Sequence, residues 1–319
     1  MPPSATGLIH IWNRCHNCGA APIVGLRFTC QTCPAGAHND LCEACYRLFE
    51  QGRIEHPSPE AREAPPGRHL FSAFEGVDRE QALRWIDVEW SSAPTPKVPD
   101  RFIVRPEFRS GRESFFGSYG FVIAQDGGGL LMLTALHVLD ELAKFRGIDC
   151  SEQNRAYTGR ELPQQVTGVM LYDPFASNWM LAEIGMAGGM LALPEARICA
   201  NEPHSQDDLA AFHVDRPNSL QPLRLAAKAP RVGDPIWLAA NRGRGVPGRT
   251  IQAVVVETTP ETLVFRFEPR VAMPPYTSGA PLLSRSGEVV AVNSGGGVLD
   301  GYNFGHACHA SSIRRHLGW

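Results

Sequence analysis

Six cysteines near the N-terminus are spaced in a way that could bind metal. They form three Cys-x-x-Cys pairs, followed by two histidines: Cys15/Cys18, Cys30/Cys33, Cys42/Cys45, then His56 and His69. Two residues between cysteines let both sulfurs turn toward one ion, and the eight soft ligands are enough for two tetrahedral zinc ions. A disulfide framework would imply secretion and a redox motif normally comes as one pair, so both alternatives fit poorly. The pattern predicts a structural zinc module.

The residues around these cysteines extend the pattern: Cys15-His16-Asn17-Cys18, the run 22–30, and Asn39-Asp40-Leu41-Cys42 continuing to Tyr46. They resemble the ZZ-type zinc finger. The resemblance implies a cross-braced order, with Cys15, Cys18, Cys42 and Cys45 on one zinc ion and Cys30, Cys33, His56 and His69 on the other. His38 and His16 remain alternatives to His56. Such modules bind short protein segments, often a free N-terminus held by acidic residues, which the resemblance places loosely at Asp40.

Length and charge limit the remaining function classes. A chain of 319 residues that is 43% hydrophobic has room for this module and one domain of about two hundred residues. The net charge of −3 does not favour nucleic acid, which would require a basic face. No apolar run approaches the roughly 18 residues of a membrane span, and the N-terminal residues do not resemble a signal peptide. We therefore expect a soluble, cytoplasmic protein with no nucleic-acid or membrane partner, whose remaining cysteines, Cys150, Cys199 and Cys308, are reduced.

The elements beyond residue 101 are predicted to be short strands. Before them, residues 75–88 have apolar residues at near-helical spacing, which predicts a connecting helix, and the prolines in 91–99 predict an extended linker. The clearest strands are 121–124, 130–134, 235–238, 251–256, 263–267 and 288–292. Many strands with few helical periods indicate an antiparallel barrel or sandwich. The predicted domains are 1–72, 73–100 and 101–319.

Three segments of this domain carry side chains that could act together as a nucleophile, a base and an orienting carboxylate. His137 ends an apolar strand, Asp208 heads another, and Ser278 lies on a tight Gly/Pro turn. A serine hydroxyl is a weak nucleophile at neutral pH, so Ser278 needs a base, and neutral imidazole titrates near that pH. Asp208 would hold the imidazole tautomer and stabilise the imidazolium, with Asp207 as the adjacent alternative.

Several features resemble the chymotrypsin/trypsin-like serine proteases: the chain order His, Asp, Ser, the sequences Thr-Ala-Leu-His, Asp-Leu-Ala and Ser-Gly-Ala-Pro-Leu, and the segment 117–123. The resemblance covers about residues 101–319 and implies a mainly β fold, a double antiparallel β-barrel preceded by the small zinc module. It implies a catalytic triad of His137, Asp208 and Ser278 and an oxyanion hole at Tyr276 and Ser278. It also places the specificity pocket at Ala272, Asn293, Ser294, Gly295 and Gly301. Because no carboxylate lies at its base, a small or apolar side chain before the scissile bond is expected.

Two departures from the family pattern bear on activity. Tyr276 and Thr277 stand where chymotrypsin-like enzymes have glycine and aspartate, and a residue with a Cβ reaches the strained turn less readily.

The leading hypothesis is an intracellular serine endopeptidase whose zinc finger recruits or gates a protein substrate. The alternative is a catalytically silent adaptor that binds peptides or proteins through the finger and the groove. A zinc-dependent hydrolase has little support, because the predicted sites leave no open position for water.

Overall fold

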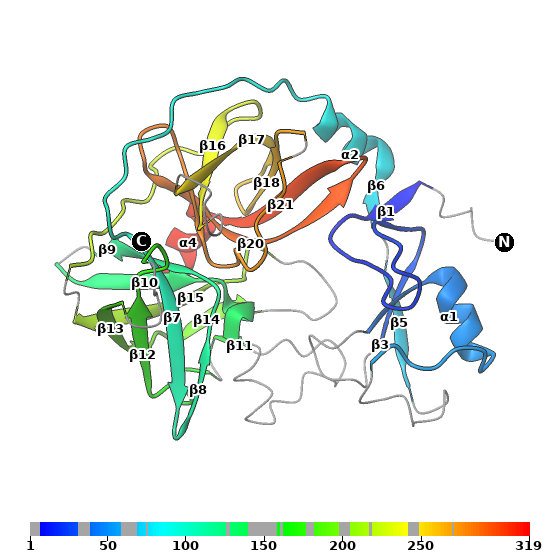
Figure 1. The fold of residues 1–319 in the computed structure, drawn as a ribbon, viewed down its shortest axis with the longest axis horizontal. Coiled ribbons are helices and arrows are strands. Elements are labelled where there is room, and N and C mark those ends of the chain that lie inside the picture. Colours follow the sequence, from blue (N-terminus) through cyan, green and yellow to red (C-terminus); the bar gives the residue numbers. More distant parts are fainter. Residues whose placement is uncertain are drawn as a thin grey trace.

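Two β-barrels and a smaller N-terminal module make up the protein, as Figure 1 shows. The computed structural model describes residues 7–30, 39–58, 69–74, 76–125, 128–139, 158–159, 162–176, 182–197, 205–216, 219–241, 249–269 and 271–319. Within them the chain is mainly β, and the predicted double-barrel architecture is confirmed.

The first barrel is closed by pairing between its first strand and a later one. Its strands are β7 (Ile103–Ser110), β8 (Glu113–Phe116), β9 (Gly120–Ala124), β10 (Leu130–Thr134), β12 (Gly168–Tyr172), β13 (Glu183–Met190) and β15 (Ala210–Arg216). The order β12-β13-β15-β10-β9-β7 becomes a ring because β7 also pairs with β12, from Gly168 opposite Arg109 to Tyr172 opposite Arg105. β8 extends β7 as a hairpin, and the short strands β11 (Thr158–Gly159) and β14 (Leu193–Arg197) pair separately.

The second barrel has six strands and ends in a helix. Its strands are β16 (Pro235–Ala239), β17 (Thr250–Thr258), β18 (Thr262–Phe267), β19 (Pro281–Leu283), β20 (Val289–Leu299) and β21 (Tyr302–His309), and α4 (Ala310–Leu317) follows. One continuous apolar cluster fills both barrels, with Phe121 and Phe212 from the first and Trp237 and Phe265 from the second fully buried. The two barrels therefore share one core, which fixes their mutual position.

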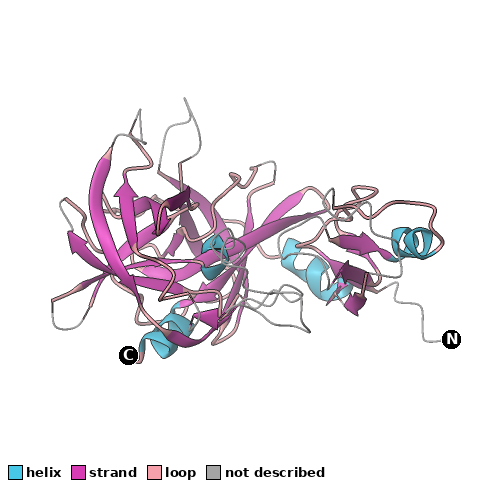
Figure 2. Ribbon diagram, turned by 90° about the horizontal axis from the view of Figure 1, so that it is seen from below, coloured by secondary structure: helices cyan, strands magenta, loops and turns pink. Residues whose placement is uncertain are grey.

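The hairpin of β20 and β21 continues beyond the barrel. Its turn residues Asp300 and Gly301 have φ of 48° and 81°, the two positive values that a tight two-residue hairpin turn requires. β19 pairs with β20 no further than Val292, so the outer half of the hairpin leaves the barrel wall. Figures 1 and 2 show it reaching toward the N-terminal module.

In its described residues, the N-terminal module consists of two small sheets and one helix. One sheet contains β1 (Leu8–His10), β2 (Ile23–Val24) and β6 (Val77–Asp78); the other contains β3 (Arg27–Cys30), β4 (Asp40–Cys42) and β5 (Phe71–Phe74); the helix is α1 (Glu43–Glu50). Its own buried apolar cluster is small, with Ile23, Leu41 and Phe49 beside Cys15 and Cys45. Burial of so little apolar surface cannot offset the entropy cost of ordering the chain. In small modules of this kind, bound metal supplies the missing folding free energy.

The segment between the module and the barrels is attached to the second barrel. Helix α2 (Arg79–Ile86) begins at Asp78, whose carboxylate accepts hydrogen bonds from two amides of the first turn. Gln81 Nε2 and Trp85 Nε1 both donate to Glu257 Oε2 on β17, at 2.8 and 3.0 Å. Farther along, Gln252 bonds to the backbone of the predicted linker at residues 91 and 93. None of the described helices has both the length and the apolar content needed to cross a membrane.

Candidate active site and metal sites

The predicted catalytic residues come from both barrels. His137 lies in a short 3-10 helix, η3 (Leu136–Leu139), directly after β10, and Asp208 stands two residues before β15. Because β10 and β15 are neighbours, with Thr134 opposite Ala210, these two side chains leave the same end of the first barrel. Ser278 lies in the turn before β19 of the second barrel. The site is thus assembled at the junction of the barrels.

The three side chains form one hydrogen-bond chain. His137 Nε2 lies 2.7 Å from Ser278 Oγ, and Nδ1 lies 2.8 Å from Asp208 Oδ2. The backbone N–H of His137 also donates to Asp208 Oδ1 at 3.0 Å. Burial by itself raises the pKa of the Asp208 carboxyl, but the attraction and hydrogen bonds of His137 outweigh it and lower the pKa below its usual value. An ionised Asp208 keeps the imidazole proton on Nδ1 and leaves Nε2 free to accept from the serine.

A glycine fixes the serine turn against the first barrel. Gly279 has φ of 80°, and a Cβ there would lie 2.1 Å from the carbonyl oxygen of Tyr119 and 2.3 Å from Thr134 Oγ1. The backbone N–H of Tyr119 donates to the carbonyl oxygen of Ser278 at 3.0 Å. Only glycine permits this approach, so the nucleophile position is set by contact between the barrels.

The loop before the serine is held by a buried amide. Tyr276 adopts φ of 58°, a left-handed conformation uncommon for a residue with a side chain, and the residue is 79% exposed. Thr277 is buried, and Asn293 Nδ2 donates to its carbonyl oxygen at 3.0 Å and to its Oγ1 at 3.2 Å. Asn293 therefore holds the loop at the position where the family pattern has aspartate. In the sequence, this contact is marked only by one amide residue, Asn293, directly after the apolar run 289–292.

A cavity of about 280 Å³ opens beside Ser278. Of the residues predicted for the pocket and oxyanion hole, Tyr276, Ser278, Asn293 and Gly295 line it, together with residues that were not predicted: Met273, Pro274, Pro275, Thr277, Gly296, Gly297, Val298 and Asn303. Ala272, Ser294 and Gly301 are not among its lining residues; Gly301 lies in the hairpin turn, and the Ser294 carbonyl oxygen lies 3.4 Å from Ser278 Oγ. Among the described lining residues none is charged, which suits an uncharged side chain.

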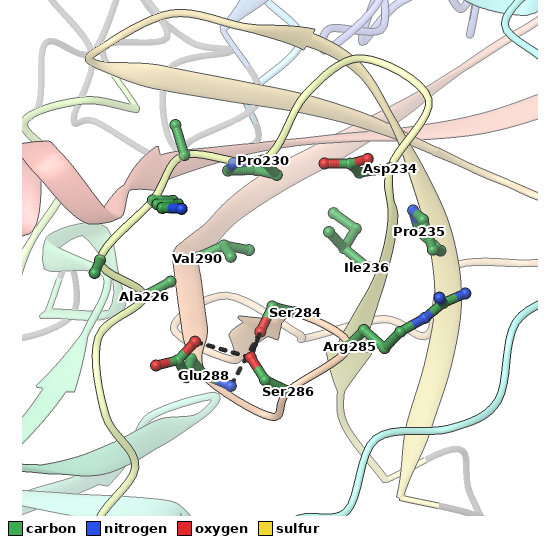
Figure 3. Close-up of a pocket in the computed structure, with 13 residues that line it drawn as sticks. Ala226, Pro230, Asp234, Pro235, Ile236, Ser284, Arg285, Ser286, Glu288 and Val290 are labelled. Carbon is green, nitrogen blue, oxygen red and sulfur yellow. Dashed lines mark hydrogen bonds between the residues drawn. The ribbon is translucent and has the colours of Figure 1, made fainter.

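A larger cavity of about 730 Å³ lies elsewhere on the second barrel (Figure 3). Its floor includes Ile236 and Val290, and on its rim Ser286 bonds to both Ser284 and Glu288. None of its described lining residues is a histidine or belongs to the Ser278 cluster. A serine needs a base within hydrogen-bond reach to become nucleophilic, so the smaller cavity is the candidate active site.

Four cysteines of the N-terminal module have the geometry of a zinc site. The sulfur atoms of Cys15, Cys18, Cys42 and Cys45 all lie within 4.8 Å of one another. A tetrahedral zinc ion with bonds of about 2.3 Å separates its sulfur ligands by about 3.8 Å. The Cys18 and Cys42 sulfurs are 3.9 Å apart. Asn17 Nδ2 also donates to Cys45 Sγ at 3.2 Å, the kind of outer hydrogen bond that zinc thiolates accept. The residues present fit the metal.

A second group contains Cys30, His56 and His69. Cys30 Sγ lies 3.6 Å from His69 Nδ1, about the separation of a sulfur and a nitrogen ligand on one tetrahedral zinc ion. Burial, reinforced by His69, lowers the pKa of His56 to about 4, which keeps it neutral, as a ligand must be. His16 instead accepts a hydrogen bond from the backbone N–H of Asp40, away from this group. Cys33 and His38 lie outside the described residues.

A double six-stranded barrel with serine, histidine and aspartate hydrogen-bonded where the barrels meet defines the chymotrypsin-like class. Residues 117–292, more than half of the chain, match the trypsin-like peptidase domain, and the chain belongs to this family. Residues 9–53 match the ZZ-type zinc finger. Both predicted families are therefore confirmed, and with them a protease domain joined to a zinc-binding module. No curated protein matches the chain.

Several solved structures are similar to the chain at low identity. The active form of the Rv3671c protease from M. tuberculosis is 16% identical, with 72% of this chain and 92% of that chain covered and a TM-score of 0.43. A serine endoprotease from Yersinia pestis is also 16% identical, with 70% and 67% covered and a TM-score of 0.41. The scabies mite inactivated protease paralogue S-I1 is 14% identical, with 68% and 92% covered and a TM-score of 0.44.

Proposed function

We propose that the protein is a serine endopeptidase that uses Ser278 as nucleophile, His137 as general base and acid, and Asp208 to orient the imidazole. The observation that carries this proposal is the unbroken hydrogen-bond chain Ser278–His137–Asp208, with distances of 2.7 and 2.8 Å, beside a cavity of about 280 Å³. Nucleophile and base within hydrogen-bond reach, with the base oriented by a third group, is the arrangement that serine catalysis requires.

The proposed reaction follows from this arrangement. Ser278 Oγ attacks the scissile carbonyl carbon while its proton passes to His137 Nε2, and the carbonyl oxygen becomes an oxyanion that accepts hydrogen bonds from the backbone N–H groups of Tyr276 and Ser278. His137 then gives the proton to the leaving amine, the C–N bond breaks, and an acyl-enzyme remains. Water attacks the acyl-enzyme with His137 again as base, which releases the acid product and restores the serine.

We further propose that the module spanning residues 1–72 holds two structural zinc ions, with Cys33 completing the second site. Four protein ligands at each ion leave no position for a reacting water, so zinc here supplies folding energy rather than catalysis. Residues 73–100 would connect this module to a protease domain of residues 101–319. We place the protein in the cytoplasm because the described cysteines, including buried Cys308, form no disulfide.

For the substrate, we propose a protein whose access the zinc module gates. The predicted capture of a free N-terminus by Asp40 is less supported than gating. The Asp40 carboxylate already accepts hydrogen bonds from Thr29 Oγ1 at 2.6 Å, Asn13 Nδ2 at 3.1 Å and Arg27 Nη1 at 3.3 Å. A carboxylate neutralised by arginine attracts an incoming ammonium group weakly. The attachment of residues 79–93 to the second barrel also argues against a free recruiting arm.

Labelling of the zinc-loaded full chain with a fluorophosphonate tests the catalytic proposal. We expect an adduct on Ser278, located by mass spectrometry, and its loss in both Ser278→Ala and His137→Ala. Failure of a folded, zinc-loaded wild-type protein to label would overturn the proposal in favour of the adaptor. The left-handed, exposed Tyr276 is the observation that favours that second candidate, because it stands where the family pattern has glycine.

A further inference from the structure

The wall of the small cavity nearest the zinc module consists of three consecutive glycines. Gly295, Gly296 and Gly297 belong to β20 and line the cavity beside Ser278. β21 pairs with them along one edge, but on the other edge no strand of the described chain does, since the pairing of β19 with β20 ends at Val292 of β20. Glycine restricts its backbone less than any other residue, so a wall built from it needs outside contacts to keep one conformation.

The two faces of this wall meet different parts of the protein. Successive residues of a strand face opposite sides. A Cβ on Gly296 would lie 2.6 Å from the sulfur of Met273, which lines the cavity. A Cβ on Gly297 would instead lie 2.0 Å from the carbonyl oxygen of Ile11 in the zinc module. At this point the wall is a single strand thick, with the cavity on one face and the zinc module on the other.

Trp12 extends the contact between the zinc module and the cavity wall to the region behind Gly295. Because Gly295 has no side chain, His306 fills the space there, and a Cβ on Gly295 would lie 2.9 Å from its Nε2. The Trp12 ring lies against the imidazole with ring centroids 4.8 Å apart, and Nδ1 of His306 is buried without a hydrogen bond to any described residue. On its other side Trp12 stacks on Trp85 of α2, with centroids 6.3 Å apart. Trp12 is therefore wedged between α2 and the back of the wall.

We propose that Ile11 and Trp12 are positioning residues for the primary specificity cavity. Their contacts hold the segment 295–297 in place and so determine which side chain, before the scissile bond, the cavity admits. This inference rests on the proposed serine-protease function and deepens it, because it makes the zinc module one support of the substrate site. A ligand that shifted the module would act on the protease through this contact.

The test uses peptidyl diaryl phosphonates that differ only in the side chain next to phosphorus: alanine, valine, leucine or phenylalanine. Such probes form a bond between Ser278 Oγ and phosphorus with loss of an aryloxide, so their labelling rates report how well each side chain enters the cavity. A simple fluorophosphonate without a peptide serves as the reference for the nucleophile itself. The variants are Trp12→Ala, the conservative Trp12→Phe, and Trp90→Ala, which removes a tryptophan from the edge of the same apolar cluster.

In Trp12→Ala we expect the ratio of labelling rates between the preferred and the least preferred phosphonate to change at least about fivefold, while the fluorophosphonate rate changes less than about twofold. Trp12→Phe should restore most of the wild-type ratio, and Trp90→Ala should retain it. Equal scaling of all rates in Trp12→Ala, or an unchanged ratio, would overturn the inference while the proposed function stands. A wild-type protein that labels with none of the probes would overturn the proposed function and the inference together.

A second variant approaches the contact from the barrel. Gly297→Ala adds a methyl group that meets the backbone oxygen of Ile11 and forces the wall or the module to move. Gly168→Ala, in strand β12 of the first barrel, is the matched glycine control because a Cβ there meets no other atom within 4 Å. We expect Gly297→Ala to change the phosphonate ratio and Gly168→Ala to leave it intact. The same ratio in both variants and the wild type would contradict the proposal even if Trp12→Ala fails to fold.

Discussion

The two barrels and the zinc module achieve order by different means. In the barrels, one apolar cluster runs through both units, and the residues that hold the triad, such as Tyr119 and Ala280, belong to it. In the module, the buried cluster includes Cys15 and Cys45, which are also candidate metal ligands. Packing therefore sets the geometry of the candidate active site, whereas we expect the fold of the module to depend on metal coordination.

A third apolar cluster joins these two regions. Ile9 and Ile11 from the module pack with Trp85 from α2 and with Leu299 and Phe304 from the β20–β21 hairpin. Arg266 reinforces the contact, since its guanidinium donates to the backbone of residues 85 and 88 while lying over the Tyr302 ring. The module shares apolar packing with the protease domain, although we expect its own fold to depend on metal. Four predictions test this division.

The largest effect is expected at the carboxylate that orients the imidazole. Asp208→Asn should lower kcat by about four orders of magnitude, because an amide no longer holds the imidazole proton on Nδ1. Asp207→Asn is the matched control, since Asp207 pairs with Arg315 and Arg197 instead. Turnover of a peptide substrate measures both. A comparable loss of kcat in Asp207→Asn would mean that Asp207 and Asp208 both support activity by stabilising the fold, and not by orienting His137.

Removal of a metal ligand should disrupt one region and spare the other. Cys42→Ser is expected to lose zinc and unfold the module, while the barrels keep their cooperative thermal transition, because none of the described residues of their core belongs to a candidate metal site. Native mass spectrometry gives the zinc content, and calorimetry gives the transition. Cys308→Ser, at the buried thiol of β21, should keep the wild-type zinc content. Unfolding of both regions in a single transition in Cys42→Ser would contradict independent ordering.

The contact between the regions should weaken in acid. Burial is the main cause that lowers the pKa of His306 from 6.5 to about 4; attraction by Asp208 opposes the shift and repulsion by His137 adds to it. As pH falls from 6.5 to 4 the unfolded chain therefore binds this proton before the folded one, so the free energy of unfolding decreases across that window. Between pH 7 and pH 5, protonation of His306 should lower the free energy of unfolding by about 1 to 2 kcal/mol.

Urea unfolding at pH 7 and pH 5 checks this effect. His10 and His56 also have pKa values lowered to about 4 and contribute to the loss in the wild-type protein. The difference between wild type and His306→Gln isolates the part due to His306. Equal pH dependence in the two proteins would show that His306 carries no differential protonation.

The smallest effect is expected at the loop before the serine. Tyr276→Gly relieves a left-handed conformation that costs about 1 to 2 kcal/mol, but glycine adds about 0.5 to 1 kcal/mol of chain entropy in the unfolded state. The net change in the free energy of unfolding should therefore stay within about 1 kcal/mol, with fluorophosphonate labelling at least as fast as in the wild type. Chemical unfolding and labelling kinetics measure the two quantities. A large fall in labelling would show that the tyrosine side chain itself supports the reaction.

Much of the architecture was predictable because the pattern of residues is local. Each of the six strands expected from apolar runs overlaps an observed strand, and a helix forms within 75–88. The outer half of β20 was not expected to be strand, because 294–297 is one serine and three glycines, which disfavour strands. Pairing with β21 overrides that preference. β12 and β13 were also missed, and their register depends on partners far away in the sequence, such as β7.

The sequence alone determined the chemistry that is available: cysteine pairs at zinc spacing, the two protein families, and a histidine, aspartate and serine in the order of a triad. These are properties of residue type and short spacing. Only the tertiary structure decided that Asn293 holds Thr277 and that Trp12 lies against His306. The latter contact joins residues almost three hundred positions apart, and nothing in either local sequence encodes it. It arises because the hairpin of β20 and β21 and the zinc module bury their apolar faces against each other.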